Sequence, residues 1–425
     1  MHDIRLLRDD LPRLREGMRR RGKLGELEPL LAQADELERE RRSAITELES
    51  QQARRNVVSA DVAKKRKAGE DAADLIAEGR AIGENISKLE VRKSNAEQAL
   101  HGILYELPNI TLADVPEGGE EANIVVRSWG TPRNVDAAIA PHWEVGKKLG
   151  LLDLERGAKI AGSGFIVYRH GGARLVRALM NFMLDVHTNE HGYEECWVPL
   201  VANEASMTGT TQLPKFRDDM YRVEDEDGFL IPTAEVPLTN LYRDEILDAG
   251  DLPKAFTAYS ACFRKEAGSA GKDTRGLLRV HEFDKVELVR YSTPEKSAAE
   301  LERMTAHAEA ILQRLELPYR VVLLAAGDTG FGSAKTYDLE VWAPGVAKWL
   351  EVSSCTLFED FQARRANIRY RPAAGEKPRF VHTLNGSALA FPRIIAAILE
   401  HFQQSDGSVA LPEALHAYMG RKTFA

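Results

Sequence analysis

The sequence predicts an α+β protein in which an antiparallel β-sheet flanked by helices follows a long N-terminal helical hairpin. The hairpin is indicated by a charged segment, residues 27–103, whose apolar residues recur at alternating steps of three and four. The sheet is indicated beyond residue 135, where short stretches of two-residue periodicity follow one another as neighbours. Such an order favours antiparallel pairing over a strict βαβ alternation. At 425 residues the chain is long enough for two or three domains.

The helical segment divides into two heptad registers separated by a break at Ala68-Gly69. The first register comprises Leu27, Leu30, Ala34, Leu37, Arg41, Ala44, Leu48, Gln51, Arg55, Val58 and Val62. The second comprises Leu75, Gly79, Ile82, Ile86, Leu89, Lys93, Ala96, Leu100 and Ile103. We expect two antiparallel helices joined by a short turn, each about 50 Å long at 1.5 Å per residue. Because polar residues interrupt both registers, the hairpin is predicted to be a projecting arm rather than a packed core.

The tip of this hairpin is strongly basic. Its basic residues are Arg54, Arg55, Lys64, Lys65, Arg66 and Lys67, opposed only by Asp61. Two interpretations fit equally well: a solvated turn, or a contact with the phosphate backbone of a nucleic acid.

The predicted domains are an N-terminal domain (1–106), a linker (107–134) and a larger domain (135–425). The linker is assigned because its sequence, LPNITLADVPEGGEEANIVVRSWGTPRN, is rich in proline, glycine and turn-forming residues. The clearest expected strands of the larger domain are Phe256–Arg264, Leu278–Arg290, Tyr319–Ala325 and Lys348–Leu357.

Charge and cysteine content restrict the class of protein. A net charge of −8 argues against a basic coat over the whole surface, so a nucleic acid would meet one region only. The three cysteines, Cys196, Cys262 and Cys355, form no CxxC pair, so we expect neither a disulfide framework nor a structural zinc site. The charged N-terminus and the absence of a long apolar run predict a cytoplasmic protein without a signal peptide or membrane span.

The segment FRKEAGSAGKDTRGLLRVHEF, residues 263–283, is the strongest candidate for a ligand site. If its flanks are strands, Arg264 and Glu266 share one face before the loop. On the far side of the loop the residues that share a face are Arg279, His281, Phe283, Lys285 and Glu287. A solvated hairpin would show the same alternation. A nucleotide site explains more, because glycines allow close backbone approach, arginine binds phosphate and an aromatic ring stacks on a base.

Two further candidates each have a structural alternative. Glu351 lies within the apolar stretch LEVSSCT, so it is either a Mg²⁺ ligand or half of a buried salt bridge. Arg393 ends the stretch HTLNGSALAFPR at the start of an apolar helix, which is either an anion site or an ordinary helix start beginning near Pro392. The sequence contains neither a GxxxxGK[ST] loop nor a GxGxxG fingerprint, so the two common nucleotide folds are not indicated.

These motifs together resemble those of the bacterial-type seryl-tRNA synthetases, a family of class II aminoacyl-tRNA synthetases. Besides the N-terminal hairpin, the matching motifs are LPKF (213–216), TAEVPLTN (233–240), FRKEAGSAGKDTRGLLRVHEFDKVEL (263–288), KTYDLEVW (335–342), EVSSCTLFEDFQARR (351–365) and HTLNGS (382–387). The resemblance covers essentially the whole chain. It implies the class II catalytic fold and a homodimer formed through motif 1, here a helix over about 173–191 followed by GYEECWVP (192–199). It also implies activation of L-serine with ATP to seryl-adenylate, and transfer of serine to tRNA(Ser) and tRNA(Sec).

The resemblance also implies the role of individual residues. Catalytic roles fall to Arg264, Arg393 and Glu351. Serine would be bound by Thr233, Ala234, Glu235, Arg264, Glu287 and Ser387. ATP would be bound by Arg264, Lys265, Glu266, Val280, Phe283, Glu351, Val352, Ser353, Ser354 and Arg393. The Mg²⁺ that accompanies ATP would be held by Glu351 and Ser354, and tRNA by Arg54, Arg55, Lys64, Lys65, Arg66 and Lys67.

More specifically, Arg264 would hold the α-phosphate and the serine carboxylate, and Arg393 the γ-phosphate. Glu266 would meet the adenine amino group and Phe283 would stack on the ring. Glu351 and Ser354 are three residues apart and would face opposite sides of a regular strand, so a bulge or a strand end is expected there.

Two other functions remain as alternatives. A synthetase-like paralogue would transfer an activated amino acid to an acceptor other than tRNA, and the complete basic hairpin argues against it. A coiled-coil interaction protein with a degenerate catalytic domain would have lost Arg264, Glu351 or Arg393, and all three are present.

Overall fold

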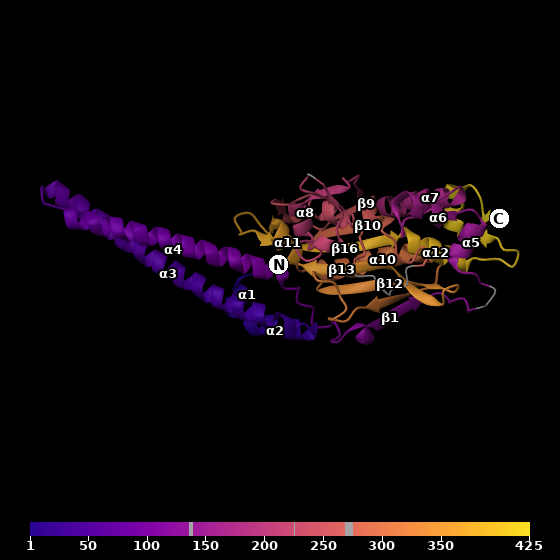
Figure 1. Cartoon of the computed structure of the whole chain (residues 1–425), viewed down its shortest axis with the longest axis horizontal. Coiled ribbons are helices and arrows are strands. Elements are labelled where there is room, and N and C mark those ends of the chain that lie inside the picture. The colour runs from indigo at the N-terminus through magenta and orange to yellow at the C-terminus, as the bar shows by residue number, and fades with distance from the viewer. Residues whose placement is uncertain (136–138, 225, 268–274) are drawn as a thin grey trace. The chain divides into compact units, whose positions relative to one another are not determined.

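The computed structural model describes residues 1–135, 139–224, 226–267 and 275–425. It divides the chain into two compact units, Met1–Pro108 and Asn109–Ala425 (Figure 1). None of the described helices combines the length and the apolar character needed to cross a membrane.

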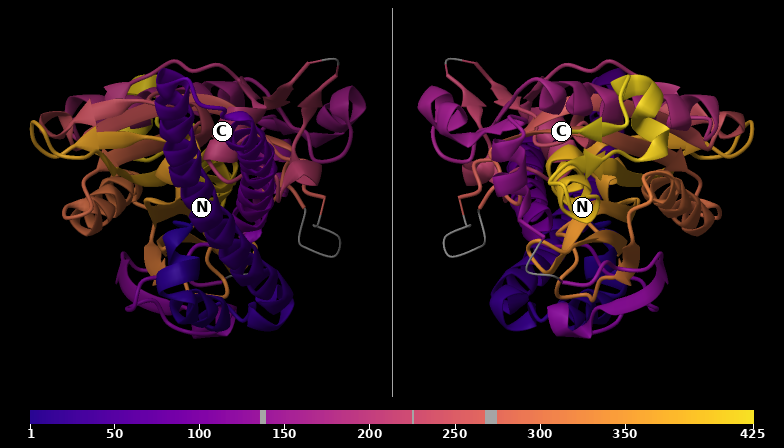
Figure 2. Two further views of the ribbon diagram at one scale, coloured as in Figure 1. Left: turned by 90° about the vertical axis from the view of Figure 1, so that its left-hand side faces the viewer. Right: turned by 90° about the vertical axis from the view of Figure 1, so that its right-hand side faces the viewer.

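The first unit is helical. Its elements are α1 (Arg5–Asp9), α2 (Leu11–Arg20), α3 (Leu24–Ala68) and α4 (Ala73–Glu106). Figures 1 and 2 show α3 and α4 side by side as the expected antiparallel hairpin. The hairpin turns at the predicted break: Gly69 ends α3 with φ 75°, a left-handed conformation that glycine adopts at little cost. With 45 residues, α3 is about 68 Å long, more than the expected length, because it extends beyond the first register at both ends, from Leu24 to Ala68.

The seam between α3 and α4 follows the predicted registers only in part. Leu31 and Glu38 are buried where the register had placed Leu30 and Leu37, and the prediction that Arg55 lies on the seam is wrong, because it is exposed. A straight α-helix drifts relative to a strict seven-residue repeat, so the buried stripe moves off the register. The buried carboxylate of Glu38 is stabilised by Arg41, whose side chain lies 2.7 Å away.

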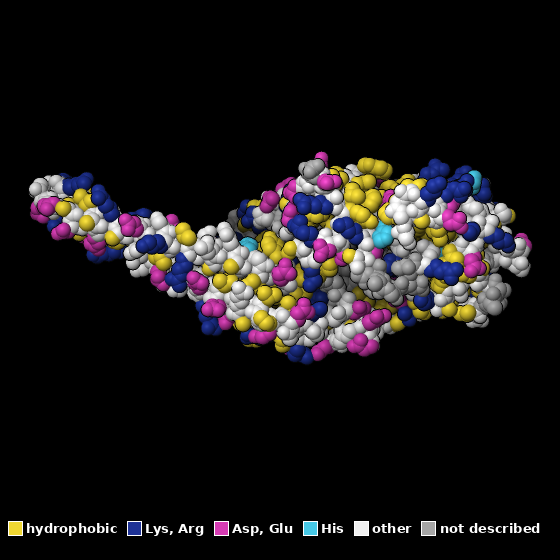
Figure 3. All heavy atoms as spheres, in the orientation of Figure 1, with side chains coloured by type: hydrophobic (Ala, Val, Ile, Leu, Met, Phe, Trp, Pro, Cys, Tyr) yellow, Lys and Arg dark blue, Asp and Glu magenta, His cyan; other side chains and the backbone are white. Residues whose placement is uncertain are grey.

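Ion pairs across the hairpin supplement this thin apolar seam. They are Arg41–Glu97, Arg92–Glu40, Arg92–Glu47 and Arg54–Glu78. Figure 3 shows acidic and basic side chains interspersed along the hairpin. Because exposed pairs of this kind contribute about 1 kcal/mol or less each, the hairpin is held mainly by its few buried apolar residues.

The second unit is built on a large sheet, which among the described residues contains eight strands in the order β1-β11-β12-β13-β16-β10-β9-β4. Their bounds are β1 (Ile124–Trp129), β4 (Glu194–Glu195), β9 (Lys254–Phe263), β10 (Glu282–Ser292), β11 (Tyr319–Leu323), β12 (Lys335–Ala343), β13 (Lys348–Glu359) and β16 (His382–Ala390). All neighbours pair antiparallel except β4 and β9. The predicted antiparallel sheet is therefore confirmed.

Two predicted boundaries need correction. Residues 124–129, which had been assigned to the linker, form β1 and pair with β11 at the edge of the sheet. The strand expected from Leu278 begins only at Glu282. Residues 277–281 lie outside the regular ladder: the Leu277 N–H and the Leu278 carbonyl bond to the side chains of His142 and Arg393 instead.

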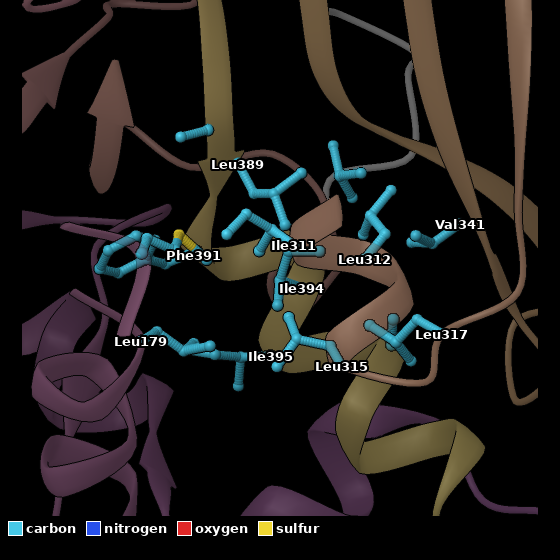
Figure 4. Close-up of a cluster of buried hydrophobic side chains, with 14 of the residues drawn as sticks. Leu179, Ile311, Leu312, Leu315, Leu317, Val341, Leu389, Phe391, Ile394 and Ile395 are labelled. Carbon is cyan, nitrogen blue, oxygen red and sulfur yellow. The ribbon is translucent and has the colours of Figure 1, made fainter. Parts of the chain in front are cut away.

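One face of the sheet is covered by helices α7 (Gly171–Asn189), α10 (Ser297–Arg314) and α12 (Phe391–His401). Figure 4 shows side chains from these helices, including Leu179, Ile311 and Ile394, packed together beside Val341 of β12. Strand residues of one parity join this core: Val286 and Leu288 of β10 are fully buried in it. The opposite parity faces the other side of the sheet, where the polar side chains gather.

The remaining elements surround this sheet. The other helices are α5 (His142–Lys148), α6 (Leu154–Ala161), α8 (Glu204–Gly209), α9 (Glu235–Thr239), α11 (Phe361–Ala366) and α13 (His416–Met419). The shorter strands are β2 (Leu152–Asp153), β3 (Val167–Tyr168), β5 (Val201–Asn203), β6 (Arg222–Val223), β7 (Gly228–Leu230), β8 (Ile246–Asp248), β14 (Arg369–Arg371), β15 (Arg379–Phe380), β17 (Val409–Ala410) and β18 (Thr423–Phe424). A second apolar cluster packs α9 and α11 against Val289 and Tyr291 of β10, beside the polar side chains of the same face.

Candidate active site

The polar face of the sheet is hollowed by a cavity of about 510 Å³. A smaller cavity of about 190 Å³ adjoins it and shares several of its lining residues. Predicted site residues that line the larger cavity are Thr233, Glu235, Arg264, Glu266, Glu351, Ser354 and Ser387. Those that line the smaller cavity are Arg264, Glu266, Val280, Phe283, Glu351, Val352, Ser353, Ser387 and Arg393. Segments that are far apart in the sequence therefore meet at one site.

One part of the site is a buried charge network centred on β10. Lys285 donates a hydrogen bond to the Thr233 hydroxyl over 2.9 Å and forms an ion pair with Glu287. The Glu287 carboxylate also accepts a hydrogen bond of 2.8 Å from Asn385 and one of 3.5 Å from Ser387. Lys285 and Asn385 were not predicted as site residues, although Lys285 shares its strand face with Glu287. That alternation was the signal that could have identified Lys285.

A second buried carboxylate, Glu235, lies at the start of α9. The Gln362 side-chain amide donates a hydrogen bond of 2.7 Å to it, and the Oε1 atom of the same amide accepts one of 2.7 Å from the Thr383 hydroxyl. Burial, reinforced by the negative charge of Glu287, raises the pKa of Glu235 to about 7. The neighbouring Ala234 lines neither cavity and packs into the apolar cluster beneath α9.

Arg264 follows the last residue of β9. Its backbone N–H donates to the His281 carbonyl over 2.9 Å, and its guanidinium lies 5.1 Å from the centre of the Phe283 ring. An aromatic ring beside a cation in a cavity can stack on a base while the cation meets its phosphates. The predicted convergence of arginine and aromatic ring is therefore present, although Arg264 lies beyond the strand itself.

Glu266, which has φ 53°, pairs with Arg279, and both residues line the two cavities. Lys265, in contrast, lines neither cavity. Its backbone N–H donates to the Asp219 carbonyl over 3.0 Å and its ammonium lies 5.9 Å from the Tyr221 ring. Of the three glycines in this motif, Gly276 is described, while Gly268 and Gly271 lie outside the described residues.

Glu351 and Ser354 lie on the same side of β13 because the strand carries a bulge. The register with β12 shifts between Leu339 and Glu340, which adds one residue to β13 after Glu351. The bulge expected from their spacing is thus confirmed. The expectation that Glu351 is buried in an apolar strand is wrong: its side chain is 49% exposed, since this face of the strand opens into the cavities.

Asp338 of β12 lies directly opposite Ser354 in the ladder. Its Oδ1 atom is buried and has no hydrogen-bond partner among the described residues. Burial, with the charge of Glu351 next in importance, raises the pKa of Asp338 well above its ordinary value. The carboxylates of Glu351 and Asp338 and the Ser354 hydroxyl fit a Mg²⁺ ion that takes its other ligands from phosphate and water, and Asp338 Oδ1 has no other partner among the described residues. The described residues contain no cluster of three or more His, Cys, Asp or Glu side chains arranged as a metal centre.

Arg393 lies in the first turn of α12, which begins at Phe391 with Pro392 as its second residue. The helix start expected near Pro392 is confirmed. The guanidinium donates to the Leu278 carbonyl over 3.1 Å and to the Glu351 carbonyl over 2.7 Å. Arg393 is thereby held at the wall of the smaller cavity, beside the carboxylate of Glu351.

The basic residues of the hairpin belong to the first unit, whereas both cavities lie in the second. Lys64, Lys65, Arg66 and Lys67 are exposed in the last turns of α3, and Arg55 is exposed as well. Arg54 pairs with Glu78 of α4 at 2.6 Å. Lys64–Lys67 therefore form the exposed basic end of the helix.

Comparison with known proteins identifies the family. Residues 1–111 match the seryl-tRNA synthetase N-terminal domain, and residues 221–402 match the class II tRNA synthetase core domain of the G, H, P, S and T enzymes. A serine–tRNA ligase of Gemmatimonas aurantiaca is 74% identical over 425 residues, covering 100% of both chains. The chain belongs to the seryl-tRNA synthetase family.

Other members of the seryl-tRNA synthetase family agree in sequence and structure. The serine–tRNA ligase of Listeria monocytogenes is 51% identical over 99% of this chain and 98% of its own. The crystal structure of Pyrococcus horikoshii seryl-tRNA synthetase complexed with ATP has a TM-score of 0.95 at 39% identity, covering 100% and 99% of the two chains. The Naegleria fowleri enzyme in complex with AMP has a TM-score of 0.90 at 29% identity, covering 100% and 98%. The fold of this chain is therefore the class II synthetase fold with the helical arm of the family.

Proposed function

We propose that the chain is a serine–tRNA ligase that activates L-serine with ATP and transfers the seryl group to tRNA(Ser). The observation that carries the proposal is the junction of the two cavities. Arg264 lines both cavities together with Lys285, which pairs with the buried Glu287, and with Glu351, which pairs with Arg393. An amino acid and a nucleotide can thus share one arginine.

The first step is attack of the serine carboxylate on the α-phosphorus of ATP, with pyrophosphate leaving. Since the carboxylate is already a nucleophile, no general base is needed, and catalysis consists of positioning and charge neutralisation. Arg264 would hold the serine carboxylate and the α-phosphate together. Phe283 and Glu266 would orient the adenine, and Arg393 would bind the γ-phosphate.

Glu351 and Ser354, with Asp338 behind them, would hold the Mg²⁺ that accompanies ATP. When bound, this ion neutralises phosphate charge as the pyrophosphate departs. The exposed carboxylate of Glu351 and the unused oxygen of Asp338 support this assignment.

Serine would be selected by its ammonium and hydroxyl groups. Glu235 and Thr233 would receive the ammonium, and Glu287 with Ser387 would bind the hydroxyl. A site that offers buried polar partners to a hydroxyl rejects an analogue without one, because those partners would be left unpaired. The buried Lys285, which pairs with Glu287, would hold its carboxylate in place.

In the second step the seryl group moves to the terminal ribose of tRNA. The N-terminal unit would bind the tRNA through the exposed residues Lys64–Lys67 and through Arg55, by contacts with the phosphate backbone. Recognition of this kind follows the shape of the RNA and weakens with salt. Charging of tRNA(Sec) would use the same arm.

The enzyme would act in the cytoplasm as a homodimer, with α7 and the segment after it at the interface. Trp197, which follows β4 at the edge of the sheet, is 80% exposed, and an exposed tryptophan there supports a subunit interface at this position.

Serine-dependent exchange of labelled pyrophosphate into ATP, measured with magnesium and without tRNA, tests the activation step. Exchange should require serine and should not be supported by alanine. Exchange supported by another amino acid in preference to serine would refute the assignment of substrate.

A further inference from the structure

We propose that His142, held by Glu400, is a positioning residue that fixes the Leu277–Leu278 segment against helix α12 for ATP binding. The proposal rests on the proposed function, because it concerns how the two halves of that nucleotide site are kept in register.

His142 and Glu400 form a fully buried pair. Both residues are 0% exposed, and the His142 Nδ1 atom lies 2.6 Å from the Glu400 carboxylate. The same carboxylate accepts hydrogen bonds from the backbone N–H groups of His142, Gly345 and Val346, at 3.0, 2.9 and 3.1 Å. A carboxylate with this many donors is firmly oriented, and it fixes the imidazole in turn.

The other nitrogen of the imidazole reaches the nucleotide-binding segment. The backbone N–H of Leu277 donates to His142 Nε2 over 2.9 Å. Since Nε2 accepts, Nδ1 carries a proton that it donates to Glu400, so the bonds on both sides fix which ring nitrogen donates and which accepts. A histidine bonded in this way holds a backbone group rather than acting as an acid or a base.

The adjoining residue of the segment is held from the same helix. The Leu278 carbonyl accepts the hydrogen bond from Arg393 Nε at 3.1 Å. Arg393 and Glu400 are seven residues apart on α12 and therefore share one face of it. Helix α12 thus binds the Leu277 N–H indirectly, through His142, and the Leu278 carbonyl directly.

These bonds replace the ladder that a strand would have provided. Residues 277–281 precede the start of β10, so their buried backbone groups need partners from elsewhere. Arg279, which follows directly, pairs with Glu266 at the cavities, and the His281 carbonyl accepts from the Arg264 N–H. A shift of the Leu277–Leu278 segment would therefore displace Arg279, which pairs with Glu266, and His281, which bonds to Arg264. Glu266 and Arg264 are the residues that contact ATP in the proposed function.

Close packing supports the same arrangement. A Cβ atom added to Gly276 would lie 2.4 Å from His142 Nε2 and 2.8 Å from the Trp143 ring. Gly276 also has φ 68°, a conformation that other residues rarely adopt. The chain thus brings its backbone against His142 immediately before the residue that His142 binds.

Two substitutions separate the two bonds of the imidazole. In H142N the amide can still donate to Glu400 from the position of Nδ1, but it cannot reach the Leu277 N–H. In H142Q the side-chain oxygen can occupy the position of Nε2 and accept from Leu277. Both variants replace a buried ring by a smaller polar group, so each serves as the packing control of the other.

The KM for ATP in pyrophosphate exchange, and the Kd for ATP by calorimetry, should rise about tenfold in H142N and remain within about threefold in H142Q. The KM for serine should change by less than about twofold in both variants. Equal kinetics in the two variants, or an equal change in the KM for serine, would overturn the proposal and leave His142 a residue of the core.

Hydrogen exchange of the unsubstituted enzyme provides a second measurement, should either variant fail to fold. The amide of Leu277 should be protected in the absence of ATP, and rapid exchange of this amide would overturn the proposal. Because calorimetry requires no serine, binding of ATP without serine-dependent exchange would refute the proposed function while still testing the role of His142.

Discussion

Gln362 donates a hydrogen bond of 2.7 Å to the buried carboxylate of Glu235, and the two side chains come from different helices of the catalytic unit. Thr383 fixes the orientation of the Gln362 amide from β16. Since an amide donor only partly compensates for burial beside Glu287, the pKa of Glu235 is raised to about 7. Glu235 therefore changes its charge in the range in which the enzyme would work.

The KM for serine should fall as the pH rises from about 6 to about 8. Serine binding would favour ionised Glu235, because its carboxylate would pair with the serine ammonium. For a pKa near 7, the ionised fraction grows about tenfold over this interval. The KM for serine measured against pH should therefore fall by a similar factor, and the dependence should be absent in E235Q. A wild-type profile that is flat over the interval would contradict this role for Glu235.

The same carboxyl group makes the free energy of unfolding depend on pH. Its pKa in the folded chain, about 7, is above the ordinary value of 4.5, so the folded state binds its proton more tightly. This stabilisation is complete below pH 4.5 and is lost as the pH rises toward 7. Urea titrations of wild type and E235Q should therefore show the wild type losing stability relative to the variant over that interval. A constant difference would show that Glu235 titrates normally.

Replacing Glu287 by glutamine should lower kcat/KM for serine by about a hundredfold or more. The substitution removes the carboxylate that would bind the serine hydroxyl and that pairs with Lys285. The Kd for ATP, measured by calorimetry, should stay within about threefold of wild type. Glu287 is fully buried and lines neither cavity itself; its partners Lys285, Asn385 and Ser387 line the larger one. Unchanged KM and kcat for serine would exclude Glu287 from substrate binding.

Replacing Glu351 by glutamine should raise the Mg²⁺ concentration required for half-maximal exchange by about tenfold or more, because a ligating carboxylate is removed. D338N should raise it by a smaller factor, since Asp338 would support the ion from behind Ser354. The matched control is E340Q, on the same strand as Asp338, where Glu340 pairs with Arg320. An equal Mg²⁺ requirement in E351Q and E340Q would argue against a metal at this position.

Removing the outer hairpin should abolish tRNA charging and leave serine-dependent pyrophosphate exchange intact. The pair Arg41–Glu97 shows which levels of the two helices face each other, so deletion of residues 43–93 with a short glycine connection cuts both helices at about the same level. The apolar base of the hairpin, with Leu31 and Leu100 fully buried, is retained. Loss of both activities would show that the arm supports the catalytic unit.

A milder variant replaces Lys64, Lys65, Arg66 and Lys67 by serine. Charging should weaken, and its dependence on salt should become shallower by about 0.7–0.9 in the logarithmic slope for each phosphate that the arm no longer neutralises. An unchanged slope would show that these residues are only a solvated helix end.

How far the sequence predicts this structure depends on the range of the interactions involved. The alternation that places Phe283, Lys285 and Glu287 on one face holds because β10 is a regular strand with one face in the core. The spacing of Glu351 and Ser354 also predicted a bulge correctly, because two residues three apart can share a strand face only with an extra residue between them.

Interactions between segments that are distant in the chain could not be predicted from the sequence. The alternation continues through Arg279 and His281, yet this stretch is no strand, since its backbone is bound by His142 and Arg393 from other parts of the chain. Nothing near Glu235 in sequence identifies Gln362 as its partner. The roles of such residues depend on tertiary contacts that no local pattern encodes.

The most direct measurement is charging of a purified tRNA pool with labelled serine, with labelled alanine and threonine in parallel, at low and high salt. The account predicts incorporation of serine in strong preference to alanine, and a steep loss of charging as salt is raised. Absence of serine charging, with serine-dependent pyrophosphate exchange preserved, would contradict it and would show that the activated serine is transferred to an acceptor other than tRNA.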